Sequence, residues 1–125
     1  MKDFRNLKVW EKAHAMALKV YKITKDFPRD ELYGITSQMR KAAVSVQTNI
    51  AEGCGRGTDG DFARFLQIAM GSANELEYLL LLSRDLILLG DKSYMEVNSQ
   101  VVEIKKMLSS LIKSVSTHLR VTPDR

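Results

Sequence analysis

Residues 49–58 read Asn-Ile-Ala-Glu-Gly-Cys-Gly-Arg-Gly-Thr, and this stretch decides the fold of a chain of 125 residues. Glycine readily adopts the left-handed conformation that closes a helix, so three glycines within five residues predict a sharp helix end. Thr58, with Asp61 three residues later, resembles a capping box in which Asp takes the place of Glu. The stretch therefore predicts a tight corner between two long helices, with a positive φ angle at Gly53 or Gly55.

Other side chains of this stretch also favour a structural corner. Glu52 and Arg56 are four residues apart and can pair on one helix face, and Asn49 can donate to carbonyl groups nearby. The glycines superficially resemble a phosphate-binding loop, but the stretch lacks the Lys-Ser/Thr pair and the preceding strand of that motif. We therefore expect a structural role for a corner set of five residues. They are Asn49, Glu52, Gly53, Gly55 and Thr58.

Apolar residues recur at three- and four-residue steps through the rest of the chain, which is typical of amphipathic helices. The first helix is expected over residues 7–26 and the third over residues 59–89. The second begins between residues 30 and 36. Ser93 and Glu96 form a capping box that is expected to start the fourth helix.

Four such helices with short corners predict an all-α fold, an up-down-up-down, left-handed antiparallel four-helix bundle. A single domain is expected over residues 1–120, followed by a frayed tail at residues 121–125. The inner face expected for the first helix is Val9, Ala13, Met16, Ala17, Val20, Tyr21 and Thr24. The inner face expected for the third helix is Phe62, Leu66, Ala69, Ala73, Leu76, Leu80, Ser83 and Ile87.

A second apolar stripe runs beside the first along the third helix, and one bundle core cannot cover both. Large exposed apolar patches usually mark an interface, whereas leucines scattered singly over a surface are the ordinary alternative. We therefore expect the protein to be a homo-oligomer. The residues expected at its interface are Phe65, Ile68, Leu79, Leu82 and Leu86.

The composition points to a cytoplasmic protein without a membrane partner. The net charge is +4 and the isoelectric point is about 9.3, a modest excess that permits an anionic partner without requiring one. The single cysteine, Cys54, excludes an internal disulfide framework and fits a reducing compartment. The N-terminus lacks a signal region, and the most apolar run, residues 78–89, is too short to span a bilayer.

The sequence offers few groups for catalysis or metal binding. Glu11 and His14 have the Glu-x-x-His spacing of di-iron bundles, but such sites need a second motif and two more inward glutamates. His118 suits the negative end of a helix. A catalytic Cys54 would need a histidine base, and nothing in the sequence ties either histidine to it. We expect neither enzyme activity nor a metal or cofactor.

A stripe of lysines on one face of the first helix is the best functional candidate. Positive charge on one face suits a phosphate backbone, although such contacts carry no base information. The same pattern is also typical of the solvated face of an ordinary amphipathic helix. The expected contacts to nucleic acid are Lys8, Lys12, Lys19 and Lys22, helped by Arg40 and Lys41 of the second helix.

Four stretches carry a family resemblance. They are Trp10-Glu11-x-Ala13, residues 33–46 (YGITSQMRKAAVSV), residues 49–53 (NIAEG) and residues 64–76 (RFLxIAxGSxxEL). Together they resemble the bacterial four helix bundle protein family, whose members include proteins encoded in intervening sequences of large-subunit ribosomal RNA genes. The resemblance extends over about residues 4–115.

This resemblance implies a left-handed four-helix bundle that assembles as a homopentameric ring. The sequence is also similar to the accessory variability protein of diversity-generating retroelements, a basic pentamer that binds nucleic acid and a reverse transcriptase. Two departures from the family pattern weaken the expected binding at the corner. Cys54 stands where an aromatic residue is frequent, and Asp59, Gly60 and Met70 stand where the family tends to be basic.

Two hypotheses follow from the sequence. The first is an oligomer that binds RNA or DNA as an accessory factor. The second is a structural or adaptor oligomer whose partner is another protein, such as a reverse transcriptase. Lysines clustered on one outer surface would favour the first hypothesis, whereas scattered lysines and an exposed apolar groove would favour the second.

Overall fold

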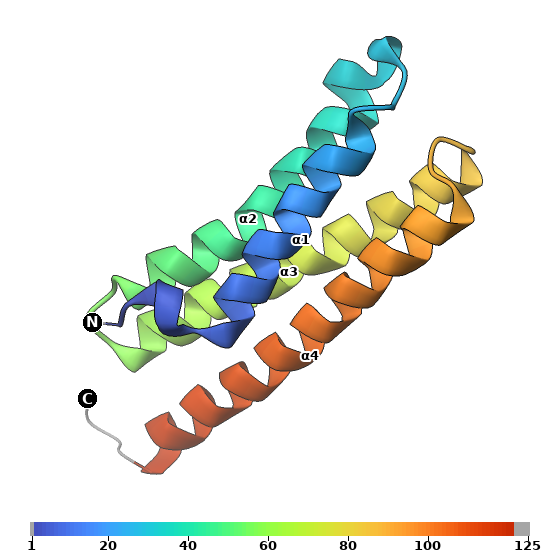
Figure 1. Ribbon diagram of the computed structural model, residues 1–125. Helices are drawn as coiled ribbons and strands as arrows, with labels where there is room; N and C mark the ends of the chain where they lie inside the picture. Colours follow the sequence, from blue (N-terminus) through green and yellow to red (C-terminus); the bar gives the residue numbers. More distant parts are fainter. Residues whose placement is uncertain (1, 122–125) are drawn as a thin grey trace.

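The chain folds into four α-helices that lie side by side (Figure 1). The computed structural model describes the backbone of residues 2–121 and the side chains of residues 2–118. Each helix packs on its neighbours in sequence, and the first also packs on the fourth, so that the four helices enclose one core. The all-α four-helix bundle is therefore confirmed. The helices are α1 (Lys8–Thr24), α2 (Ser37–Cys54), α3 (Asp59–Asp85) and α4 (Asp91–Val121).

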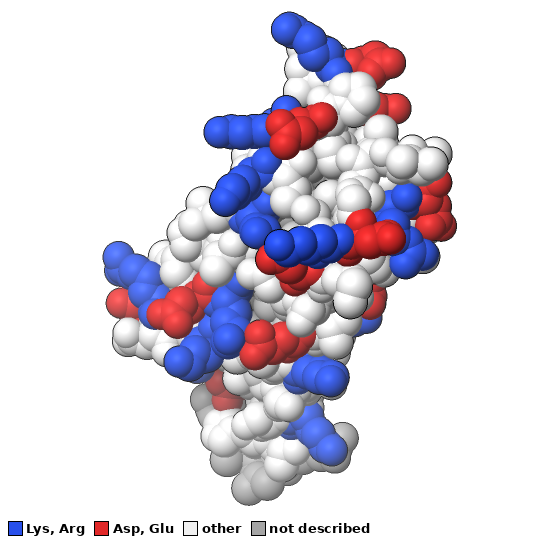
Figure 2. All heavy atoms as spheres, turned by 45° about the vertical axis from the view of Figure 1, so that its right-hand side comes forward, with Lys and Arg blue, Asp and Glu red and all other residues white. Residues whose placement is uncertain are grey.

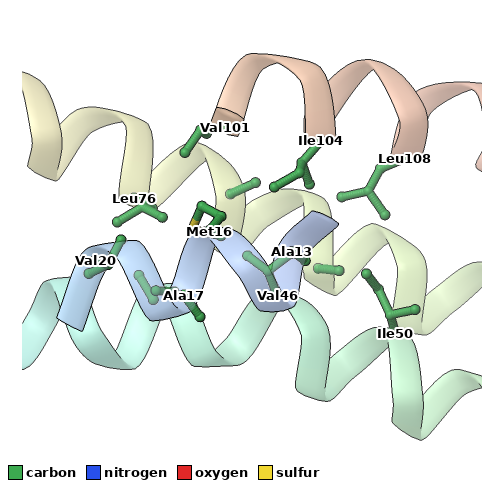
Figure 3. Packing of buried hydrophobic residues seen from close by; sticks show 14 of the residues in the cluster. Ala13, Met16, Ala17, Val20, Val46, Ile50, Leu76, Val101, Ile104 and Leu108 are labelled. Atoms are coloured by element: carbon green, nitrogen blue, oxygen red, sulfur yellow. The ribbon is translucent and has the colours of Figure 1, made fainter. Parts of the chain in front are cut away.

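One hydrophobic core runs through the bundle. Figure 3 shows Met16 of α1 among side chains from the other three helices, including Leu76 of α3 and Ile104 of α4. The three- and four-residue steps seen in the sequence place these side chains inside because they repeat at nearly the period of the helix. Small residues such as Ala13 and Ala73 are fully buried and let the helices approach closely.

Two residues assigned to inner faces lie outside the core. Tyr21 is 43% exposed, and the guanidinium of Arg40 lies over its ring at 4.8 Å. Ile87 is 89% exposed because α3 ends at Asp85, before the helical pattern reaches it. Periodicity alone therefore adds one exposed residue to the inner face predicted for each of these two helices.

The glycine corner has a different geometry from the one expected. None of the glycines in the described chain has a positive φ angle, so the prediction for Gly53 and Gly55 is wrong. Gly55 keeps right-handed helical angles (φ −81°, ψ −9°), and its N–H donates to the carbonyl oxygens of Ala51 and Glu52 at 3.3 and 3.1 Å. Gly53 lies inside α2, where a Cβ atom would stand 2.9 Å from the Cβ of Phe65. Glycine at position 53 thus permits the close approach of α2 and α3.

The other members of the corner set make local contacts. Thr58 precedes α3, and its hydroxyl accepts the N–H of Asp61 at 3.1 Å. Glu52 and Arg56 lie 3.3 Å apart as an i,i+4 ion pair. Asn49 donates its amide N–H to the carbonyl oxygen of Ser45, one turn earlier, at 2.8 Å. The contacts of Glu52 and Asn49 therefore link successive turns of the chain, and the contact of Thr58 caps the start of α3.

The end of α3 contains the left-handed residue that was expected at the glycine corner. Ile87 has φ 61° and is the one non-glycine residue with positive φ in the described chain. Its N–H donates to the carbonyl oxygen of Arg84, and the N–H of Leu88 donates to that of Ser83, both at 2.9 Å. This pair of bonds is a Schellman motif, which usually places glycine at the left-handed position. The motif explains why α3 stops four residues before the expected Leu89.

The start of α4 also differs from the expectation. The helix begins at Asp91, and the N–H of Tyr94 donates to the carbonyl oxygen of Gly90 at 2.9 Å to close the first turn. Ser93 therefore lies within the helix, and the capping box of Ser93 and Glu96 is wrong.

The connection between α1 and α2 is built of short irregular turns. A 3₁₀ turn (Arg29–Glu31) leads into a π turn (Leu32–Thr36), and Gly34 within it has non-helical angles (φ −110°, ψ −117°). This turn keeps Leu32 and Tyr33 outside the core and exposed. The expected tail lies outside the described residues from position 122 onward, whereas Val121 still belongs to α4.

Candidate nucleic-acid interface

The lysines of α1 face acidic residues of α4. Lys12 Nζ lies 3.2 Å from a carboxylate oxygen of Glu103, and Lys19 Nζ lies 3.8 Å from one of Glu96. Both pairs are partly exposed, so each contributes little to stability. They do, however, offset the charges of two of the four α1 lysines that were expected to bind a phosphate backbone. On the face shown in Figure 2, basic and acidic groups are interleaved and do not form an unbroken basic field.

The other two lysines of the stripe, Lys8 and Lys22, are exposed and have no ion pair within the described part of the chain. Lys8 lies at the edge of a hollow between α1 and α4, together with Lys106. The hollow is lined by the apolar side chains of Leu7, Met107 and Leu111. Two lysines of the α1 stripe, Lys12 and Lys19, are therefore paired with glutamates of α4, and a third, Lys8, lies beside an apolar hollow.

Arg40 and Lys41 of α2 lie in a different setting from the α1 lysines. The Nε–H of Arg40 donates to the hydroxyl of Thr24 at 2.9 Å, and its guanidinium stacks over Tyr21. Thr24 is buried and donates its own hydroxyl to the carbonyl oxygen of Val20 at 2.7 Å. Arg40 is thus fixed by a hydroxyl and a ring, and its positive charge is not neutralised by a carboxylate within the described residues.

These two cations line an open groove of about 640 Å³ on the outer side of α2, which we call the α2 groove. Tyr21 contributes from α1 and the π turn contributes two residues, so three elements meet there. The lining residues are Tyr21, Leu32, Tyr33, Ser37, Arg40, Lys41, Val44, Ser45 and Thr48. Four of them present substantial apolar surface, since Tyr33 is 94% exposed and Tyr21, Leu32 and Val44 are each about 40% exposed.

A smaller hollow of about 190 Å³ adjoins the α2 groove and shares Leu32 and Arg40 with it. It adds Lys25 and Arg29, both exposed, to the lining. Four cations therefore surround the two hollows, and no carboxylate lines either of them. Asp26, Asp30 and Glu31 belong to the same α1–α2 connection but lie outside both linings. Among the expected nucleic-acid contacts, Arg40 and Lys41 thus lie with two further cations, Lys25 and Arg29, in linings that contain no carboxylate.

The residues expected at an oligomer interface are divided between the core and the surface. Phe65 and Leu79 are buried within the single chain, and Leu82 is half-buried against the core. Ile68 and Leu86 are exposed, at 41% and 53%. The expectation that the single chain leaves this second stripe uncovered is wrong for two residues. The ring of Phe65 lies against the guanidinium groups of Arg56 and Arg64, at 4.8 and 4.4 Å, and Leu79 belongs to the core.

Comparison with known proteins places this fold in a family. Residues 5–110 match the family described as 23S rRNA-intervening sequence protein. The chain belongs to this family. None of the curated proteins matches it. A solved structure from Bacteroides thetaiotaomicron, described as a protein with unknown function from the S23 ribosomal protein family, has 29% identity and a TM-score of 0.76. The alignment covers 84% of this chain and 98% of that one.

The cysteine and the two histidines, which were considered for catalysis or metal binding, make contacts within the fold. Cys54 is 2% exposed, and burial raises the pKa of its thiol. His14 stacks on the ring of Trp10 with centroids 5.2 Å apart. His118 Nδ1 lies 2.5 Å from a carboxylate oxygen of Asp59, which joins the far part of α4 to the start of α3. Within the described residues, no group of three His, Cys, Asp or Glu side chains is arranged to hold a metal ion.

Over residues 2–121, no helix combines the length and the apolar character needed to cross a membrane.

The α2 groove contains functional candidates that sequence reasoning missed. The sequence pattern places Tyr21 on the inner face of the first helix, and it leaves Leu32 and Tyr33 within the range where the second helix could begin. The sequence did contain one signal, the pair Leu32-Tyr33. Two large apolar residues that fit no inner face in a connection between helices can form an exposed apolar surface, and such surfaces often mark binding sites. The contact of Tyr21 with Arg40, 19 residues away, left no signal in the sequence.

Proposed function

We propose that this protein is a non-enzymatic accessory factor that binds RNA or DNA without reading base sequence. The observation that carries the proposal is the group of cations around the α2 groove and its adjoining hollow, Lys25, Arg29, Arg40 and Lys41, with no carboxylate in either lining. Cations grouped in this way can bind the phosphates of a nucleic-acid backbone. Their binding displaces counterions from the nucleic acid, and the release of these counterions favours the complex.

The proposed contact surface is centred on α2, and the α1 lysines have a secondary role. Lys12 and Lys19 would have to leave Glu103 and Glu96 before they could bind phosphates, whereas Arg40 and Lys41 would not. Arg40 is also held in place by Thr24, so less side-chain entropy is lost when it binds an anion.

Self-association belongs to the proposal, with a pentamer as the number that the family resemblance implies. One copy presents about four cations to phosphates, which corresponds to a salt slope of about −3 for single strands. Several copies in one assembly would present this surface repeatedly to one strand, so the apparent affinity would rise without any new contact. The exposed side chains of Ile68 and Leu86 are the proposed interface residues that remain available in the single chain.

A titration of labelled single-stranded and duplex oligonucleotides over a range of salt concentrations tests the proposal by fluorescence anisotropy. The double variant Arg29→Gln, Lys41→Gln should weaken binding to every sequence and reduce the magnitude of the salt slope for the single strand by about 1.4, because two phosphate contacts are lost. The matched control is Lys92→Gln, Lys113→Gln, which removes the same charge from exposed positions of α4. Equal losses in the two double variants would show that only net charge matters, and no binding by the unaltered protein at low salt would reject the proposal.

The second candidate function is that of an adaptor oligomer that binds a protein such as a reverse transcriptase. The hollow between α1 and α4 favours it, because half-buried Leu7, Met107 and Leu111 line it together with Lys8 and Lys106. Such a surface suits the apolar face of an acidic amphipathic helix. Met107→Glu should abolish binding of such a partner and leave nucleic-acid binding unchanged, whereas the double variant Arg29→Gln, Lys41→Gln should do the reverse.

A further inference from the structure

We infer that the α2 groove binds single-stranded nucleic acid, by stacking unpaired bases on Tyr33 and Tyr21 while Arg40 and Lys41 hold the neighbouring phosphates. This inference rests on the proposed function and names the class of ligand for the same surface. Surfaces that bind single strands combine aromatic rings with a cationic groove, because every base has a face that can stack and every nucleotide carries a phosphate.

Tyr33 is the main stacking residue of this surface. Its side chain is 94% exposed in the π turn that precedes α2, and its ring contacts no other ring or cation within the described residues. An aromatic side chain in water keeps apolar surface hydrated, and a base stacked on its face would remove that surface from water. The turn places this ring beside a groove that also contains cations, so stacking and phosphate contacts can occur together.

Tyr21 provides a second and more rigid ring on the opposite element. The guanidinium of Arg40 covers one side of the ring at 4.8 Å, and the side chain remains 43% exposed. Arg40 is in turn fixed by the buried hydroxyl of Thr24. The ring and the cation are therefore oriented before a ligand arrives, which reduces the entropy that binding has to overcome.

The rest of the groove suits nucleotides that are not paired. Val44 and Leu32 add partly exposed apolar surface to the groove, and Ser37 and Thr48 are also lining residues. A duplex hides the faces of its bases within the stack, so it can contact the cations of the groove but cannot use the two tyrosines. The groove should therefore bind a single strand more tightly than a duplex of equal length.

A second copy of this chain is the competing occupant of such an apolar surface. The charge of the groove favours the polyanion, because Arg40 and Lys41 line it, Lys25 and Arg29 line the adjoining hollow, and no acidic side chain lines either. The hydroxyl groups of the tyrosine, serine and threonine side chains that line the groove can also hydrogen-bond to bases and phosphates.

The test compares Tyr33→Ala with Tyr78→Ala, which removes another exposed tyrosine from α3, outside the groove. The probes are a labelled oligothymidine strand and a labelled duplex of the same length, measured by anisotropy. Tyr33→Ala should weaken single-strand binding about tenfold and change duplex binding less than about twofold, while Tyr78→Ala changes neither. Tyr33→Trp should restore the affinity, and its fluorescence should be quenched when the single strand is added.

Each alternative gives a different result. Unchanged single-strand affinity in Tyr33→Ala would overturn stacking but leave the proposed function intact, since the cation variants could still lose binding. Equal losses for strand and duplex would overturn the preference for unpaired bases. A smaller assembly mass for Tyr33→Ala in light scattering would assign the groove to a second copy of the chain. No binding of either probe by the unaltered protein would reject both the inference and the proposed function.

Discussion

The residue that ends α3 gives a sharp test of how the bundle is built. Ile87 holds a left-handed conformation (φ 61°) that side chains with a branched Cβ rarely adopt. That conformation costs an L-residue about 1–2 kcal/mol, and glycine adopts it without this cost. The isoleucine side chain is 89% exposed, so replacing it loses almost no buried surface. Because glycine also makes the unfolded chain more flexible, the net gain from Ile87→Gly should be about 0.5–1 kcal/mol.

Urea unfolding followed by circular dichroism measures this gain as a higher midpoint with an unchanged slope. A thermal midpoint about 2–5 °C higher should accompany it. The control is Leu18→Gly, which places glycine at an exposed position inside α1 and should cost about 1 kcal/mol. If Ile87→Gly destabilised the protein as much as Leu18→Gly, the Schellman motif would be the wrong description of this helix end.

Three further predictions concern other parts of the bundle. Gly53→Ala should destabilise the protein by about 1–3 kcal/mol in urea unfolding, because the new Cβ would stand 2.9 Å from Phe65, whereas Gly57→Ala, with open space around it, should change stability little. Cys54 should react with a thiol reagent near neutral pH far more slowly in the native protein than in urea, since burial raises its pKa and blocks access; equal rates would contradict its buried position. Leu86→Lys should leave the helical content unchanged but lower the mass measured by light scattering, and an unchanged mass would remove Leu86 from the proposed interface.

The architecture could be predicted because it depends on a long-range repeat. The steps of three and four residues in α3 continue from Phe62 to Ser83, and every residue of that series is buried. In a pattern of this length, a single residue that breaks the spacing does not change the assignment of the helix. Similar patterns in the other three segments therefore predict four helices and most of their inner faces. The same reasoning fails at Ile87, where the helix has already ended.

Helix ends could not be predicted with the same success because they depend on a few backbone angles. Three glycines favoured a left-handed corner at residues 53–57, yet all glycines in the described chain have negative φ and the left-handed residue is an isoleucine. Gly53 is required for packing against Phe65, a contact between helices that no local rule contains. Ser93 and Glu96 have the residue types of a capping box, but Ser93 lies three positions after Gly90, the residue that precedes α4.

The candidate site was only partly visible in the sequence. The lysine stripe of α1 follows from helical periodicity, but its pairing with Glu96 and Glu103 depends on how α1 and α4 are placed side by side. The α2 groove joins Tyr21, Tyr33 and Arg40 from three separate elements, one of them an irregular turn. Neither arrangement is encoded in the spacing of residues along one helix.

The contact between the α2 groove and nucleic acid is tested most directly by photo-crosslinking. A single strand that carries 4-thiothymidine would be bound to the protein at low salt and irradiated, and the crosslinked peptides would be identified by mass spectrometry. We expect crosslinks at Tyr33 and Tyr21, which line the groove, and their disappearance in competition with unlabelled single strand but not with an equal amount of duplex. Crosslinks confined to α4 or to the first turns of α1, or none at all, would contradict the assignment of nucleic-acid binding to this groove.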